Sequence, residues 1–76
     1  MQTLIMLKAD RVDGEDSKFI DYIPWREVKR IRVFRDEQAI EIEFRSGGRS
    51  IYQFVSGAAF SATWDDIRQI DEELED

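Results

Sequence analysis

The stretch VKRIRVFRDEQAIEIEFR, residues 28–45, decides the fold, because its polarity alternates on either side of a short polar break. Alternation with a period of two is typical of β-strands that bury one face. A two-residue turn at Asp36 and Glu37 predicts one register that satisfies both faces, although a slightly longer loop is an alternative, since Asp-Glu is a weak turn pair. The predicted cross-strand pairs are two apolar and two of opposite charge: Val33–Ile40, Ile31–Ile42, Arg32–Glu41 and Arg30–Glu43.

A second hairpin follows, with Gly47 and Gly48 at its tip, where a tight turn requires positive φ. The register of this turn predicts three pairs on the inner face of the sheet: Phe44–Ile51, Ile42–Gln53 and Ile40–Val55. It predicts two pairs on the outer face: Glu43–Tyr52 and Glu41–Phe54.

The N-terminal part predicts two further strands. The first begins at Leu4 and runs to about Val12, where the sequence DGED, residues 13–16, is a turn signal. The second covers Phe19 to Ile23 and ends at Pro24, which lacks the N–H that a central strand donates.

The C-terminal part predicts one helix that starts near Ser61 or Thr63. Thr63 is the expected N-cap, and Asp66 stands in the capping-box position. Asp65 and Asp66 would lie in the first turn, at the positive end of the helix dipole. Apolar residues then recur at helical spacing: Trp64, Ile67, Ile70 (or Asp71 in its place) and Leu74.

These elements predict a single small α+β domain over residues 1–76: a four- or five-stranded antiparallel β-meander closed by one C-terminal α-helix. Residues 75–76 are expected to fray as an acidic tail, because acids at a helix C-terminus oppose its dipole. The expected core is the inner sheet face under the helix: Ile31, Val33, Ile40, Ile42, Phe44, Ile51 and Val55, with Trp64, Ile67 and Leu74 above it.

Residues 20–55 resemble bacterial PH-like and GRAM-like domains. The resemblance rests on YIPWREVKRI (22–31), AIEIEF (39–44) and RSIYQF (49–54), whose rhythm is that of an "I-P-x-x-x-I-x-x-I" entry into a meander. The chain is shorter than a full PH barrel, so the resemblance implies at best a reduced version of it. It also implies a binding module rather than an enzyme, and it transfers no ligand site.

The residue types give little support for catalysis. The chain has no histidine and no cysteine, so the usual general base, thiol nucleophile and commonest transition-metal ligands are missing. We therefore expect no enzyme, no metal and no cofactor. An oxygen-rich cluster surrounds Gly14, but a solvated hairpin turn explains it better than a cation site: Asp10, Asp13, Glu15 and Asp16.

The outer face of the sheet is the first candidate contact surface. It would combine aromatic and arginine side chains, which are enriched at protein interfaces. Alternatively, the N-terminal strand or a loop covers this face and the aromatics are core. The predicted site residues are Arg30, Arg32, Glu41, Glu43, Tyr52 and Phe54.

A basic segment, Arg26–Arg35, is a candidate nucleic-acid contact, because its five bases are interleaved with Trp25 and Phe34. Two of these bases are neutralised in the predicted register, and an acidic chain repels phosphate at long range. Nucleic-acid binding is therefore the least favoured of the alternatives.

The acidic C-terminal end is the second candidate contact surface. Residues 65–76 contain seven acids and one base and thus carry the whole net charge of −6. They are either a solvated tail or a patch for a basic partner: Asp65, Asp66, Glu72, Glu73, Glu75 and Asp76.

Together these features predict a small protein-interaction module with a basic protein partner, or a homodimer. The alternative is an anti-defence inhibitor from a phage or mobile element that mimics nucleic-acid charge. The sequence shows no signal peptide and no apolar run that could span a membrane, so we expect a cytoplasmic protein.

Overall fold

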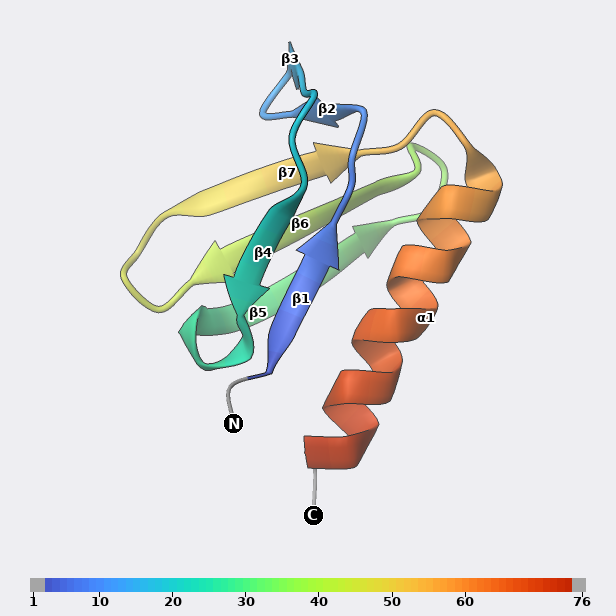
Figure 1. Cartoon of the computed structure of the whole chain (residues 1–76). Helices are drawn as coiled ribbons and strands as arrows, with labels where there is room; N and C mark the ends of the chain where they lie inside the picture. The colour runs from blue at the N-terminus through green and yellow to red at the C-terminus, as the bar shows by residue number, and fades with distance from the viewer. Residues whose placement is uncertain (1–2, 75–76) are drawn as a thin grey trace.

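The computed structural model describes residues 3–74, with side chains as far as Glu72. It confirms a small α+β domain with two antiparallel sheets and one C-terminal helix (Figure 1). The smaller sheet pairs β1 (Leu4–Leu7) with β4 (Asp21–Pro24), and we call it the β1–β4 ribbon. The larger sheet has the order β3-β2-β7-β6-β5.

The larger sheet contains the predicted meander and two very short strands. Its elements are β2 (Arg11–Val12), β3 (Glu15–Asp16), β5 (Val28–Phe34), β6 (Ala39–Phe44) and β7 (Arg49–Gln53). A one-turn 3₁₀ helix, η1 (Trp25–Glu27), connects the ribbon to β5. The first strand does not run on to Val12 as predicted. It ends at Leu7, and the chain then crosses from the ribbon to the larger sheet.

The first hairpin forms in the predicted register. All four predicted pairs are present, and the backbone N–H of Gln38 donates to the Arg35 carbonyl (3.2 Å) to close the turn at Asp36 and Glu37. The opposite charges therefore share the outer face, while Ile31 and Val33 line the inner face.

The predicted register of the second hairpin is wrong. Its loop has three residues, Arg45–Gly47, and the backbone N–H of Phe44 donates to the Gly48 carbonyl (2.8 Å). Of the two glycines at this turn, Gly47 takes a positive φ, 109°, as a type I turn followed by a glycine bulge requires, and Gly48 does not. The strand thus shifts by three residues, and an odd shift exchanges the two faces. Ile40 now pairs with Tyr52, and Glu41 with Ile51.

The core lies between the inner face of the larger sheet and the layer formed by the β1–β4 ribbon and α1 (Figure 1). Two predicted core residues are wrong, because the register shift leaves Ile51 and Val55 exposed. The buried cluster includes side chains from all three parts: Ile5, Leu7, Ile23, Val28, Ile40, Ile42, Tyr52, Phe54, Phe60 and Ile67.

The helix α1 (Gly57–Leu74) starts earlier than predicted. Ser56 caps it, because its Oγ accepts a hydrogen bond from the Ala59 N–H (3.2 Å). The predicted N-cap, Thr63, instead lies inside the helix and donates its hydroxyl to the Ala59 carbonyl (2.8 Å). Asp65 and Asp66 are consequently far from the first turn. Trp64, Ile67 and Ile70 do face the core, joined by Phe60.

Candidate functional site

The predicted outer-face site is divided by the register of the second hairpin. Its charged half is present: Arg30 and Glu43 are 3.9 Å apart, and Arg32 and Glu41 are 3.8 Å apart. Its aromatic half is wrong, because Tyr52 and Phe54 are only 4% exposed and belong to the core. The prediction that these two aromatics contact a partner is therefore corrected.

The real outer face is a charged surface with little apolar area. Phe34 and Ile51 replace the predicted aromatics there, and each is only partly exposed. Glu41 is the one buried charged side chain in the described part of the chain, and Arg32 offsets it. This face balances its own charges across β5 and β6, so it offers a partner few unsatisfied groups.

The predicted acidic surface is only partly within the described side chains. Asp65, Asp66 and Glu72 are exposed on α1, whereas the side chains of Glu73, Glu75 and Asp76 lie outside the described part. Asp65 also forms an ion pair with Arg68. Successive helical residues point about 100° apart, so Asp65 and Asp66 do not form one flat acidic face.

The basic segment does not form a single stripe either. Arg26 lies in η1, Arg30 and Arg32 pair with glutamates, and Arg35 lies in the turn after β5. Nucleic-acid binding through these residues stays a prediction.

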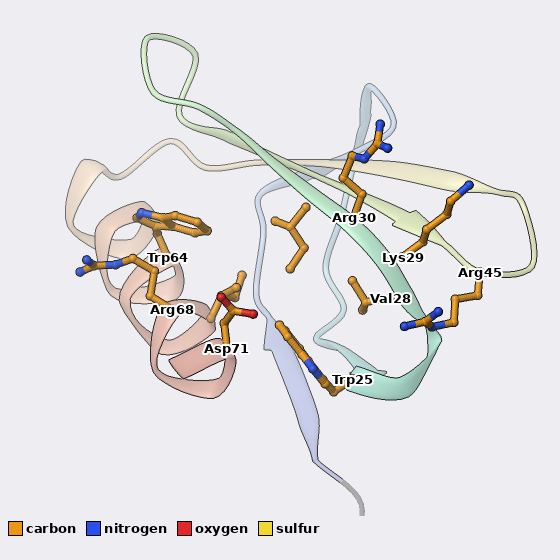
Figure 2. Close-up of a pocket in the computed structure, with 10 residues that line it drawn as sticks. Trp25, Val28, Lys29, Arg30, Arg45, Trp64, Arg68 and Asp71 are labelled. Carbon is orange, nitrogen blue, oxygen red and sulfur yellow. The ribbon is translucent and has the colours of Figure 1, made fainter. Parts of the chain in front are cut away.

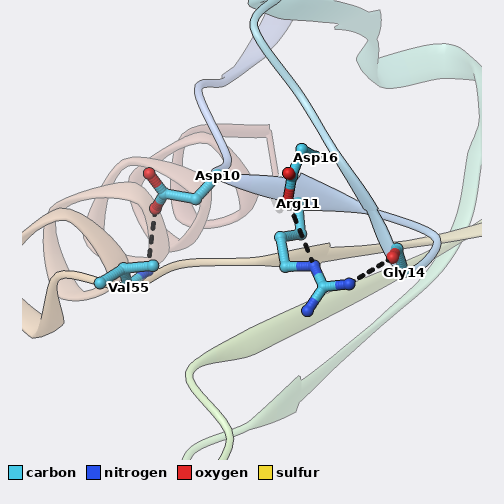
Figure 3. Close-up of polar contacts among 5 residues, drawn as sticks. All are labelled: Asp10, Arg11, Gly14, Asp16 and Val55. Atoms are coloured by element: carbon cyan, nitrogen blue, oxygen red, sulfur yellow. Dashed lines mark hydrogen bonds and ion pairs between the residues drawn. The ribbon is translucent and has the colours of Figure 1, made fainter.

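Two of the acids around Gly14, Asp10 and Asp13, accept hydrogen bonds from backbone N–H groups that are distant in the sequence. The backbone N–H of Val55 donates to Asp10 Oδ2 (2.8 Å), and that of Ile51 donates to Asp13 Oδ1 (2.9 Å). Arg11 pairs with Asp16 and donates to the Gly14 carbonyl (Figure 3). No group of three or more potential metal ligands occurs within residues 3–74. Asp10 and Asp13 thus serve as hydrogen-bond acceptors for β7 and the segment after it.

An exposed apolar surface that the sequence analysis missed covers the β1–β4 ribbon. Leu4 and Met6 alternate with the buried Ile5 and Leu7, and Tyr22 pairs with Met6 on the same outward side. The ribbon and the residues just before β4 expose five large apolar side chains, at 43% to 77%: Leu4, Met6, Phe19, Ile20 and Tyr22. The continuous apolar run Leu4 to Leu7 could have signalled this surface, because a strand of apolar residues alone presents apolar side chains on both faces.

Two grooves lie on opposite sides of α1. The β1 groove, about 260 Å³, separates β1 from α1, and its lining contains one acid and no base: Leu4, Ile5, Met6, Asp66, Gln69 and Ile70. The β5 groove, about 390 Å³, separates β5 from α1, and both tryptophans of the chain line it (Figure 2). The helix α1 therefore borders both grooves, and the charged residues that line the two grooves differ.

No family model matches the chain, and no curated protein or solved structure matches it either. The resemblance to PH-like domains stays a prediction. Within the described residues, no helix is both long and apolar enough to cross a membrane.

Proposed function

We propose that this protein is a non-enzymatic interaction module that binds another protein through the outer face of the β1–β4 ribbon. The observation that carries this proposal is the row of exposed apolar side chains on and beside the ribbon, which includes Met6, Phe19 and Tyr22. Exposed apolar clusters on small domains mark interaction sites, and Met, Phe and Tyr are enriched at protein interfaces.

The proposed partner carries an apolar surface with a basic rim. The β1 groove continues the ribbon surface toward α1, and Asp66 is its one charged lining residue. The chain as a whole also has an excess of carboxylates, with a net charge of −6. Lysine or arginine at the partner's rim would complement these carboxylates and speed association.

A binding role also agrees with the chemistry of the residues. The chain contains neither histidine nor cysteine, and the neighbouring carboxylates of Glu41 and Glu43 are each paired with an arginine. The alternative of nucleic-acid mimicry gains little support from α1, because Asp65 and Asp66 point about 100° apart and Asp65 pairs with Arg68.

The test compares two double variants that add the same charge. Immobilised protein captures its partner from an extract of its host, mass spectrometry identifies the partner, and calorimetry with the purified partner measures affinity. We expect Met6→Asp plus Tyr22→Asp to weaken binding about 100-fold or more, because each removes a buried anchor of the complex. The control, Phe34→Asp plus Ile51→Asp on the outer face of the larger sheet, should bind like the wild type.

Circular dichroism and urea unfolding must show that both variants are folded. If the ribbon variant binds as tightly as the wild type, or the control alone loses binding, the ribbon is not the interface.

A further inference from the structure

We propose that the β5 groove binds an extended acidic segment of a partner protein, which adds to the free edge of β5 as another strand. This site lies on the other side of α1 from the β1 groove. It is independent of the interface proposed above, and the two sites can take different partners.

Five of the side chains that line the β5 groove are apolar, and two of these are tryptophans. Trp64 approaches from α1 and Trp25 from η1, and both rings border the space between the helix and β5 (Figure 2). Val28, Ile31 and Ile67 complete the apolar lining. Both tryptophans are only partly buried. The whole groove has a volume of about 390 Å³ and can accept an apolar side chain of a ligand.

One side of the groove is the edge of a sheet. β5 is the last strand of the larger sheet and pairs only with β6 within the described residues. Four consecutive residues, Val28 to Ile31, line the groove, because a register shift between Val28 and Arg30 interrupts the alternation of faces there. The groove thus lies along the start of the edge strand, where backbone N–H and C=O groups are available to another strand.

The charges at the groove favour an acidic ligand. Four bases line it, Lys29, Arg30, Arg45 and Arg68, against one acid, Asp71. Arg30 and Arg68 already pair with Glu43 and Asp65.

Lys29 and Arg45 form no ion pair within the described part of the chain, so they are the cations available to a ligand. A hydrogen bond from Arg45 Nε to the Arg26 carbonyl (2.9 Å) holds this arginine in place. A carboxylate on an added strand would reach these cations while its apolar neighbour enters the groove.

A polypeptide fits this site better than a nucleic acid or a second copy of the chain. A nucleic acid lacks the alternating backbone donors and acceptors that pair with a strand edge. A second copy's β5 would bring Lys29, Arg30 and Arg32 against identical charges, and cations on edge strands prevent such self-pairing. An acidic segment would instead be attracted to these cations.

The two tryptophans provide a built-in probe, because they are the only ones in the chain and both line the groove. A displayed library of random, tryptophan-free peptides is selected on the purified protein, and the best peptide is titrated while the intrinsic fluorescence is recorded. We expect Asp- and Glu-rich peptides, a saturable fluorescence change, and weaker binding at higher salt. Amides of β5 should gain protection from hydrogen exchange when the peptide is bound.

Matched variants assign the binding to the groove. Lys29→Glu plus Arg45→Glu should weaken the peptide about tenfold or more, and Lys29→Glu alone should weaken it if the double variant is unstable. The control, Lys8→Glu plus Lys18→Glu, makes the same change in charge at two exposed residues away from the groove and should bind like the wild type.

The proposal would be overturned by any of these results: no selected peptide, a consensus without acids, or equal loss of affinity in the groove and control variants. Binding of a labelled oligonucleotide that the groove variant abolishes would also overturn it, in favour of a nucleic-acid site.

Discussion

Tyr52 lies directly opposite Ile40 across the ladder of β6 and β7, and this pairing turns its ring into the core. Phe54 follows on the same face and packs against Phe60, with ring centroids 6.1 Å apart. Removing a buried aromatic ring costs about 3–5 kcal/mol, and a small domain has only about 5–15 kcal/mol in total. We therefore expect Tyr52→Ala plus Phe54→Ala to abolish cooperative urea unfolding. Ile51→Ala, on the exposed face, should change the free energy of unfolding little. A folded double variant would contradict the register of β7.

The stability of the protein should fall at alkaline pH because of Tyr52. Burial and the negative charge of Asp21 raise its pKa from 10.0 to about 12. As the pH rises, the unfolded chain ionises this phenol before the folded chain does. The stabilisation that Tyr52 contributes is therefore fully present below pH 10.0 and is lost as the pH rises from 10.0 through about 12. Urea midpoints across this range should fall less in Tyr52→Phe. In Tyr22→Phe, which leaves Tyr52 as the only tyrosine, absorbance should show a late phenolate titration.

The two glycines of the second hairpin should respond differently to alanine. Gly47 has φ 109°, which an L-residue adopts only with strain, whereas Gly48 has no such requirement and an added Cβ meets no atom within 4 Å. Gly47→Ala should lower the free energy of unfolding by about 1–2 kcal/mol. Gly48→Ala should be neutral or slightly stabilising. Equal effects in thermal unfolding would argue for the symmetric two-residue turn that the sequence predicted.

The start of α1 can be tested with two hydroxyl residues. Ser56→Ala removes the acceptor of the Ala59 N–H and should cost about 1 kcal/mol, as loss of an N-cap does. Thr63→Ala removes a mid-helix hydroxyl and replaces a β-branched residue with the best helix former, so it should cost less or stabilise. A larger loss for Thr63→Ala in urea unfolding would indicate a helix that begins later.

The sequence predicted the fold class because the strongest pattern, residues 28–45, is local and satisfies two faces at once. It predicted the second hairpin less well, since two adjacent glycines fit more than one turn and an error of three residues exchanges the faces. The start of α1 was predicted too late, near Ser61 or Thr63, because Gly57, which follows the true cap Ser56, is a poor helix former.

The candidate surfaces were harder to predict than the strands. The charged pairs Arg30–Glu43 and Arg32–Glu41 were found, because they follow from register alone. The ribbon surface and the β5 groove were missed, because they depend on which strands separate into another sheet and on where α1 lies. Trp25 and Trp64 are far apart in the sequence, and no short-range pattern connects them.

The ribbon also sets how the molecule opens. Within the described residues, no backbone hydrogen bond joins β1 or β4 to a strand of the larger sheet. The ribbon is thus held to the larger sheet by side-chain packing, in which Ile5, Leu7 and Ile23 are buried, and loss of this packing gives the ribbon amides an opening route of their own. Native-state exchange should divide the amides into two kinetic populations, and the faster one would be the surface that we expect to meet a partner.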